Sequence, residues 1–406
     1  MHTAVNRYAG LNNDELMAHW VAQVGAVARP SMNDAPFCRV INQDAILNLC
    51  LSVGDFNPLW LSSDYGLSSP YGSNLAPPYM LFSLAPWSMH GTVFFSFRDE
   101  AGDLLPRPGE GGVQGGITLT WRRRLRLGDR IACEARLAAA RTHQSRTWGR
   151  TFELVVEFLF RDELGNHVAT GSFSWLGTEH RDVQKARPNL TPKTWTMEEI
   201  EEIRTQYAAQ SGKLRGGLPR YWEDVAVGDS LPTIIKGPYT EMSYIAFSIA
   251  VPLRTVNATD ETYWNLAYAT NVEGWPHRGP IGSNEPTRQG VPTGHRYHFD
   301  YESARNRGLP APIDVGHQRV CWMAQLLTMW MGDHGHLRQM RARHVDVNMM
   351  GDLTRCTGVV TGKAVKEDGD HVIQIEVGCE SQRGPSTQGS AEIALPSRDP
   401  ATTATV

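Results

Sequence analysis

The 406-residue chain has no large excess of charge of either sign, since its formal net charge is −4 and its sequence pI is about 6.4. No broad basic surface is expected, which argues against nucleic acid as a partner. No run approaches the roughly 20 apolar residues that cross a bilayer, and residues 1–20 lack the charged start and apolar centre of a secretory signal. We therefore expect a cytoplasmic protein with no membrane partner.

The sequence also lacks the short motifs of nucleotide and metal chemistry. It has no P-loop, no G-x-G-x-x-G preceding a helix and no zinc-ligand spacing, so no metal is expected. Its six cysteines form no C-x-x-C pair and several lie in apolar runs, which predicts buried, reduced thiols. With 41% apolar and 20% charged residues, the chain has the balance of a soluble protein with two ordinary domains.

What the chain does contain is an internal repeat, in which three features recur in the same order. The first is a helix start, with cap residues Asn42 and Thr240 before short apolar runs. The second is a Gly-Asp pair opening a strand, at 128–129 and 351–352. The third is a strand that ends at Gly-Ser, at 171–172 and 389–390.

The repeat divides the chain into two similar halves joined by a linker that contains a capping box. The second half carries one long insertion rich in Asn, Gly and Pro, of the kind that often forms a substrate wall or lid. The predicted boundaries are an N-terminal domain over 1–179, a linker over 180–217, a C-terminal domain over 218–397 with its insertion at 251–292, and a tail over 398–406.

Strand-like runs in both halves, among them 117–121, 152–160 and 371–377, accompany one strongly apolar helix per half. Residues 320–331 are apolar nearly all round, as a buried helix must be, and residues 78–89 are the first-half counterpart. The pattern predicts an α+β fold, in which each half is an antiparallel sheet wrapped round a central helix.

The most specific motif is the run Gly54-Asp55-Phe56-Asn57-Pro58-Leu59-Trp60. It resembles the G-D-x-N-P-L-H segment of the MaoC-like, or (R)-specific, enoyl-CoA hydratases, with Trp60 at the histidine position. A second copy begins at His298 and fits the H-x-D-x-x-x-A continuation of that motif, but Thr293 stands where its aspartate would be. The Asp/His pair is thus split between the halves.

This resemblance covers nearly the whole chain and implies a double hotdog fold whose substrate is an acyl-CoA thioester, with coenzyme A as part of the substrate and no other cofactor. In the family the histidine takes a proton from water, which suits an imidazole because its pKa lies near neutrality. The indole N–H of Trp60 can donate a hydrogen bond but cannot take a proton from water. Its expected role is therefore to shape a pocket or to bind a carbonyl oxygen. His298 is then the candidate base, with Thr293 and Asp300 to orient water or the ring.

Several other candidate site residues could instead have a purely structural role. Asp55 and Asn57 either take part in the chemistry or simply hold the turn through Asx hydrogen bonds. In the family the amides that begin the central helix polarise the thioester carbonyl, which singles out Gly316 and His317, and Tyr79 in the weaker, proline-containing first-half turn. Trp275 in the insertion is a candidate wall residue. Arg124 either faces the coenzyme A phosphates or lies on a solvated strand face.

Three functions remain open on the sequence alone. The leading hypothesis is a hydratase or dehydratase acting on a bulky enoyl-CoA or 3-hydroxyacyl-CoA. The second is a thioesterase that hydrolyses a bulky or polycyclic acyl-CoA with a directly positioned water. The third is a non-catalytic acyl-CoA-binding partner subunit, since decay would also leave a split pair. A homodimer of double-hotdog chains is possible in each case.

Overall fold

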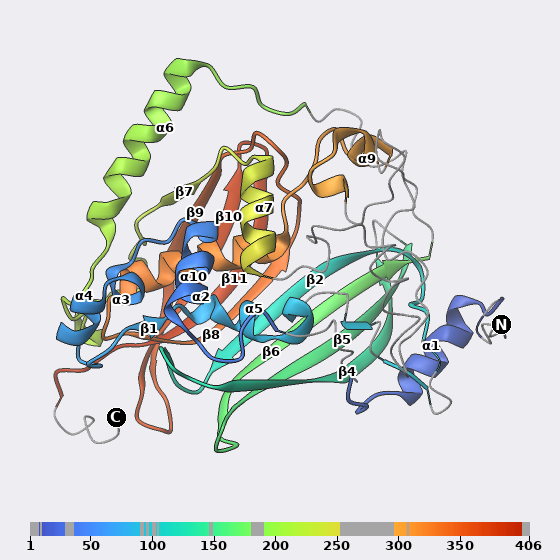
Figure 1. Cartoon of the computed structure of the whole chain (residues 1–406), viewed down its shortest axis with the longest axis horizontal. Coiled ribbons are helices and arrows are strands. Elements are labelled where there is room, and N and C mark those ends of the chain that lie inside the picture. Colours follow the sequence, from blue (N-terminus) through green and yellow to red (C-terminus); the bar gives the residue numbers. More distant parts are fainter. Residues whose placement is uncertain are drawn as a thin grey trace.

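The structure is a computed structural model that describes residues 8, 10–28, 36–89, 93–94, 97–99, 103, 105–145, 149–179, 191–251, 296–306 and 308–399. In this part of the chain, strands from both halves form one nine-stranded antiparallel sheet with helices packed against one face (Figure 1). The predicted α+β double hotdog arrangement is confirmed. The predicted domain boundaries stay predictions, and nearly all of the insertion lies outside the described residues.

The sheet has the strand order β4-β5-β6-β2-β8-β11-β10-β9-β7, so the halves join edge to edge at β2 and β8. At this junction Thr118 pairs with Arg341, and every pairing in the sheet is antiparallel. A small separate pair is made by β1 and β3. The bounds are β1 Leu75–Ala76, β2 Glu110–Trp121, β3 Leu125–Arg126, β4 Ile131–Ser145, β5 Gly149–Asp162, β6 His167–Thr178, β7 Ile234–Lys236, β8 His336–His344, β9 Thr354–Val365, β10 His371–Ser381 and β11 Gly384–Ala394.

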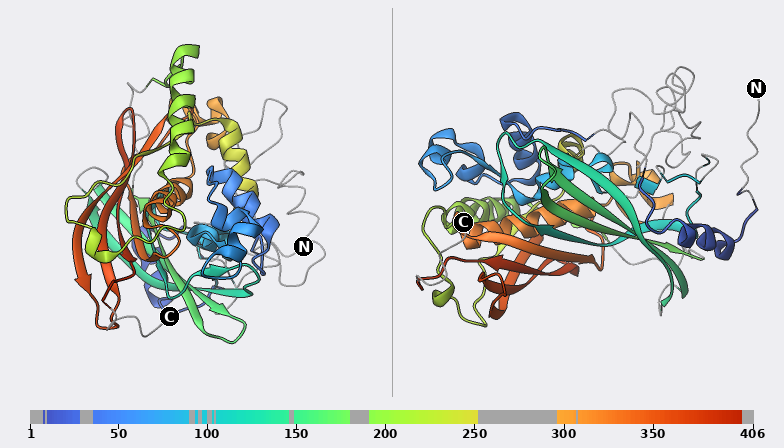
Figure 2. Two further views of the ribbon diagram at one scale, coloured as in Figure 1. Left: turned by 90° about the vertical axis from the view of Figure 1, so that its left-hand side faces the viewer. Right: turned by 90° about the horizontal axis from the view of Figure 1, so that it is seen from below.

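The helices lie mainly on one face of the sheet, while α6 runs beside the edge strand β7 (Figures 1 and 2). The α-helices are α1 Asn13–Ala22, α2 Gln43–Val53, α3 Pro58–Leu61, α4 Ser63–Ser68, α5 Leu81–Leu84, α6 Met197–Gln210, α7 Glu241–Ala250, α9 Tyr301–Asn306 and α10 Gly316–Met331. The short 3-10 turns are η2 Pro78–Met80, η3 Pro86–Met89, η6 Ser211–Lys213, η7 Trp222–Asp224 and η8 Arg296–His298.

The central helix differs between the halves. In the second half α10 is continuous, and all of its residues from His317 to Met331 are buried, as its apolar pattern predicts. The prediction of one matching helix over residues 78–89 is wrong, because this segment consists of η2, α5 and η3. Ala85 is extended, with φ −78° and ψ 129°, since the ring of Pro86 disfavours a helical residue before it.

The repeated features mostly have the predicted structure. Asn42 caps α2 by accepting from the backbone of Ala45, and Thr240 forms a capping box with Ser243 at the start of α7. The Gly-Asp pairs precede β4 and β9, and the linker helix α6 begins at its predicted capping box. The Gly-Ser pairs do not end strands, because β6 and β11 continue beyond them to Thr178 and Ala394.

All six cysteines are free thiols in the described residues; five of them are buried, as predicted, and Cys133 is half-buried. Among the described residues, no helix has the length and apolar character to span a membrane.

Candidate functional site

The first-half motif loop, residues 54–60, closes around a buried carboxylate. Asp55 is 1% exposed, and it accepts hydrogen bonds from the Tyr79 hydroxyl (2.7 Å) and the Trp60 indole N–H (3.3 Å). A third hydrogen bond comes from the backbone N–H of Asn57 (3.1 Å), whose own side chain caps α3. The loop therefore has the Asx geometry of the structural alternative, and the indole of Trp60 donates to the aspartate beside it.

A lysine from the second half reaches this loop. Lys236 of β7 is 4% exposed, and its Nζ donates to the carbonyl oxygens of Val53 (2.8 Å) and Gly54 (2.9 Å). Burial lowers the pKa of Lys236 to about 8, against the opposing attraction of Asp55. Burial also raises the pKa of Asp55, against the Tyr79 hydrogen bond and the Lys236 charge. The charge of Lys236, which comes from the second half, thus partly offsets the effect of burial on the pKa of the motif aspartate.

A partly open pocket adjoins the first-half motif. Asn57 and Trp60 line it, together with Pro78 of the first-half turn and Trp121 of β2. It lies at the C-terminal end of α10, since Thr328 and Met331 form another side. The pocket occupies the position at which the first-half reaction site is expected, but Tyr79 lies fully buried in the core as a donor to Asp55.

Arg124 lies in the wall of the same pocket. Its Nη2 donates to the carbonyl oxygens of His334 (2.9 Å) and Gly335 (3.0 Å), and its guanidinium lies 5.2 Å from the ring centroid of Tyr71. These contacts tie the first-half strand segment to the end of α10. A contact with coenzyme A phosphates stays a prediction.

In the second half, His298 is held just before the start of α10. It is 7% exposed, its Nδ1 lies 2.8 Å from the carbonyl oxygen of Ile313, and its ring stacks on Tyr244 at 5.2 Å. A carbonyl oxygen only accepts, so Nδ1 carries the proton in the neutral ring and Nε2 is the basic nitrogen. Ile313 lies three residues before Gly316, so the imidazole is anchored beside the N-terminus of α10.

The neighbours of His298 are placed only in part. Asp300 forms an ion pair with Arg296 (3.1 Å) and accepts from the backbone N–H of Ser303 (2.7 Å), so it stabilises the start of α9. Thr293 and Trp275, the other predicted residues of this region, lie outside the described residues.

The N-terminus of α10 has no side-chain cap. Its N-cap residue is Val315, whose side chain has no acceptor, and among the described residues no side chain accepts from the first amides of the helix, which begin at Gly316. His317 is fully buried, with Nε2 3.0 Å from the carbonyl oxygen of Met89, and burial lowers its pKa to about 4. Its side chain thus faces the first half, and its backbone amide is the part placed at the helix end.

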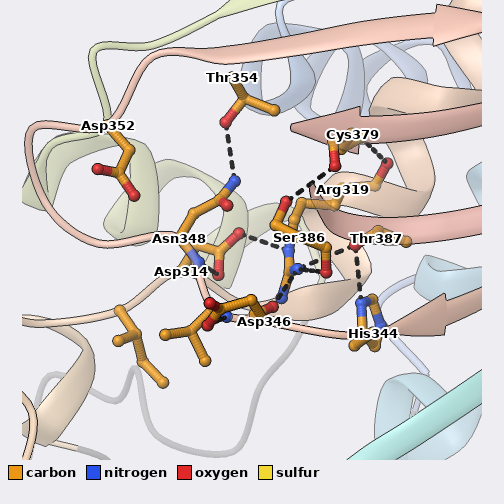
Figure 3. Close-up of polar contacts among 12 residues, drawn as sticks. Asp314, Arg319, His344, Asp346, Asn348, Asp352, Thr354, Cys379, Ser386 and Thr387 are labelled. Atoms are coloured by element: carbon orange, nitrogen blue, oxygen red, sulfur yellow. Dashed lines mark hydrogen bonds and ion pairs between the residues drawn. The ribbon is translucent and has the colours of Figure 1, made fainter. Parts of the chain in front are cut away.

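A buried polar network, drawn in Figure 3, fixes this helix end to the sheet. Arg319 pairs with Asp314 (2.8 Å), and burial raises the pKa of Asp314 to about 6 although the Arg319 charge opposes the shift. Arg319 also donates to the carbonyl oxygens of Asp346 (2.7 Å) and Ser386 (2.6 Å) and to the Thr387 hydroxyl (2.9 Å). The first turn of α10 is therefore held against β8 and β11.

Two further side chains reach the same helix end and were not singled out from the sequence. A Cβ atom added to Gly316 would lie 2.8 Å from Nε2 of His344 and 3.0 Å from Oε1 of Gln114. His344 ends β8 and Gln114 lies in β2, so each half contributes one. The sequence carried no signal for this meeting, because both residues lie in ordinary strands. For Lys236 the sequence offers a weak signal of a structural role, because a charged residue ends the short apolar strand β7.

The comparisons with known proteins agree with this geometry. Residues 31–171 match the family model of the FAS1-like dehydratase domain region, while no curated protein matches the chain. A solved MaoC-like dehydratase is similar with a TM-score of 0.61 at 14% identity, covering 93% of this chain and 100% of its own. A MaoC domain protein from Chloroflexus aurantiacus J-10-fl has a TM-score of 0.55 at 11% identity, with coverages of 92% and 96%.

A conserved protein of Mycobacterium tuberculosis with a double hotdog fold is also similar, with a TM-score of 0.52 at 12% identity and coverages of 96% and 99%. The chain is thus a double hotdog protein. Its first half contains the region that matches the FAS1-like dehydratase model, and its fold is similar to that of the MaoC-like dehydratase. The double hotdog fold that the sequence resemblance implies is confirmed.

Proposed function

We propose that the chain is an acyl-CoA hydratase or dehydratase whose reaction takes place in the second half, at the N-terminus of α10. The observation that carries the proposal is the placement of His298. Its Nδ1 donates to the carbonyl oxygen of Ile313, three residues before Gly316, which makes Nε2 the basic nitrogen of a ring anchored next to the start of α10.

These groups suit the addition of water to an enoyl-CoA. Nε2 of His298 takes a proton from water as the water oxygen bonds to C3 of the C2=C3 double bond. The electron pair of the double bond moves toward the thioester oxygen, where the amides that begin α10 stabilise the enolate. The imidazolium then returns its proton to C2, so that one water is added overall. Dehydration is the reverse sequence.

The contrast between the two central segments supports a bulky acyl group. The continuous α10 fills the second half, whereas the first half has only η2, α5 and η3 in the corresponding place. The pocket beside the first-half motif is lined by Pro78 of this broken segment and by the apolar residues Leu59 and Trp121. The substrate class therefore remains the bulky enoyl-CoA or 3-hydroxyacyl-CoA expected from the sequence.

Mass spectrometry of acyl-CoA esters incubated with the purified protein tests the proposal. The panel contains straight-chain and polycyclic enoyl-CoA esters with their saturated counterparts. A gain or loss of one water with coenzyme A still attached is the expected result. Release of free coenzyme A from saturated esters would replace the proposal by the thioesterase, and activity only after a second chain is added would identify a partner subunit.

A further inference from the structure

The ring of His344 lies directly against the first residue of α10. Its Nε2 is 2.8 Å from the position that a Cβ atom on Gly316 would take, so the side chain at 316 must be absent for the two to meet. The Nε2 atom is shielded from solvent, and among the described residues it has no hydrogen-bond partner. A buried imidazole nitrogen without a partner costs free energy unless a ligand satisfies it.

The contacts of Thr387 determine which nitrogen of His344 carries the proton. Thr387 is 1% exposed, and its hydroxyl oxygen accepts from Arg319 (2.9 Å) and lies 3.1 Å from Nδ1 of His344. The hydroxyl proton needs an acceptor, and Arg319 has none to offer. Among the contacts of this hydroxyl within the described residues, Nδ1 of His344 is the atom that can accept its proton, which places the hydrogen of the neutral ring on Nε2.

The surroundings keep this ring neutral. Burial, the charge of Arg319 and the neighbouring His317 hold the pKa of His344 well below its usual value. Its role is then that of a hydrogen-bond donor, opposite to that of His298, whose Nδ1 donates and whose Nε2 is basic.

We infer that His344 is an oxyanion donor, whose Nε2–H joins the first amides of α10 in holding the thioester carbonyl oxygen. The inference rests on the proposed reaction site and adds a second catalytic histidine with a distinct task. A neutral imidazole can polarise a carbonyl group without transferring its proton, and its N–H strengthens as a donor when negative charge develops on the oxygen.

Glutamine and phenylalanine substitutions separate a donor from a base. In His344→Gln, the side-chain amide keeps an N–H near the Nε2 position, so turnover of trans-2-decenoyl-CoA should stay within about tenfold of wild type. His344→Phe removes the donor and should lower kcat by about 100-fold to 1000-fold, as loss of one oxyanion-hole donor does. His298→Gln should be as inactive as an alanine variant, because an amide cannot replace a base. His143→Gln, at an exposed histidine, is the matched control.

A spectroscopic reading accompanies the kinetics. Bound 2,4-hexadienoyl-CoA absorbs at longer wavelength when its carbonyl is polarised, so the red shift should persist in His344→Gln and shrink in His344→Phe. Equal loss in both variants, or full activity and an unchanged shift in His344→Phe, would overturn the donor role. If wild type hydrates neither these esters nor any other straight-chain or polycyclic enoyl-CoA of the mass-spectrometry panel, the proposed function itself fails. Circular dichroism and thermal unfolding verify that each variant is folded.

Discussion

The two halves place different side chains at matching positions beside their central segments, and these side chains make different contacts. Trp121 and His344 occupy matching places, since 344 minus 121 and 351 minus 128 both equal 223, the spacing of the two Gly-Asp pairs. The Trp121 indole N–H donates to the carbonyl oxygen of Pro78 (3.0 Å) in the first-half turn. The His344 ring instead meets Gly316, the first residue of α10, with its Nε2 unpaired among the described residues.

The motif loops differ in the same way. The carboxylate of Asp55 accepts hydrogen bonds from Tyr79 and Trp60 and is attracted by the charge of Lys236, so its interactions are made within the protein. His298 has its Nδ1 anchored to a carbonyl group, so the ring is oriented with a basic nitrogen. The comparison teaches that the two motif copies are held differently: the aspartate of the first is hydrogen-bonded by its own loop and by Tyr79, whereas the histidine of the second is anchored through Nδ1 to a backbone carbonyl group near α10.

The largest expected effect concerns the lysine that joins the halves. Lys236→Met should lower the free energy of unfolding by about 3–5 kcal/mol, because it leaves the Asp55 charge buried without its counter-charge and frees the carbonyl oxygens of Val53 and Gly54. Chemical denaturation measures this loss. The double variant Asp55→Asn with Lys236→Met should recover part of it, and strict additivity of the two single variants would contradict the coupling.

The next effect belongs to the second-half site. His298→Ala should lower kcat by about 100-fold or more if its Nε2 is the general base, with a smaller change in KM. Steady-state kinetics on an enoyl-CoA found active by mass spectrometry provides the measurement. A change within twofold would exclude His298 as the base, and His143→Ala serves as a control on the exposed surface.

A smaller effect concerns His336 in the first-half pocket. Burial, with a lesser contribution from the Arg124 charge, lowers the pKa of His336 to about 3. Because the unfolded chain binds this proton below a pH of about 6.5 and the folded chain does not, stability should fall as the pH drops from about 6.5 toward 3.

The variant His336→Gln tests this sign. It should unfold with a weaker pH dependence than wild type, the two curves differing by about 1 kcal/mol between pH 7 and pH 5 after allowance for partial solvent screening. Denaturation at a series of pH values gives both curves. Parallel curves would show that His336 takes no part, whereas the opposing titration of Asp314 is common to both proteins and cancels.

The smallest expected effect is no change in activity when the family histidine is restored in the first half, a result that would sharpen the comparison of the two halves. Trp60→His restores the family residue in the first half, but Asp55 stays 1% exposed and bonded to Tyr79, so we expect no recovery of activity in a His298→Ala background. The measurement is the same enoyl-CoA assay. Recovery would mean that the first half lost its chemistry through residue 60 alone.

Much of the fold was predictable because it rests on local patterns. The caps at Asn42 and Thr240, the Gly-Asp pairs and the all-round apolar character of α10 follow from backbone chemistry and periodicity. The first-half central helix was mispredicted because the effect of Pro86 on Ala85 was overlooked, although it can be read from the sequence. The Asx geometry of Asp55 and Asn57 was foreseen as one of two alternatives.

The sequence by itself determined the duplication, the strand and helix periods and the split motif, since each depends on residues close together in the chain. Only the tertiary structure decided which copy has its polar groups satisfied. Lys236 meets Val53 across 183 positions, and His344 meets Gly316 from a different element. Contacts of this kind depend on how strands and helices pack. A polar atom that is hydrogen-bonded within the protein is not available to a substrate, so these long-range contacts decide which side chains can bind one.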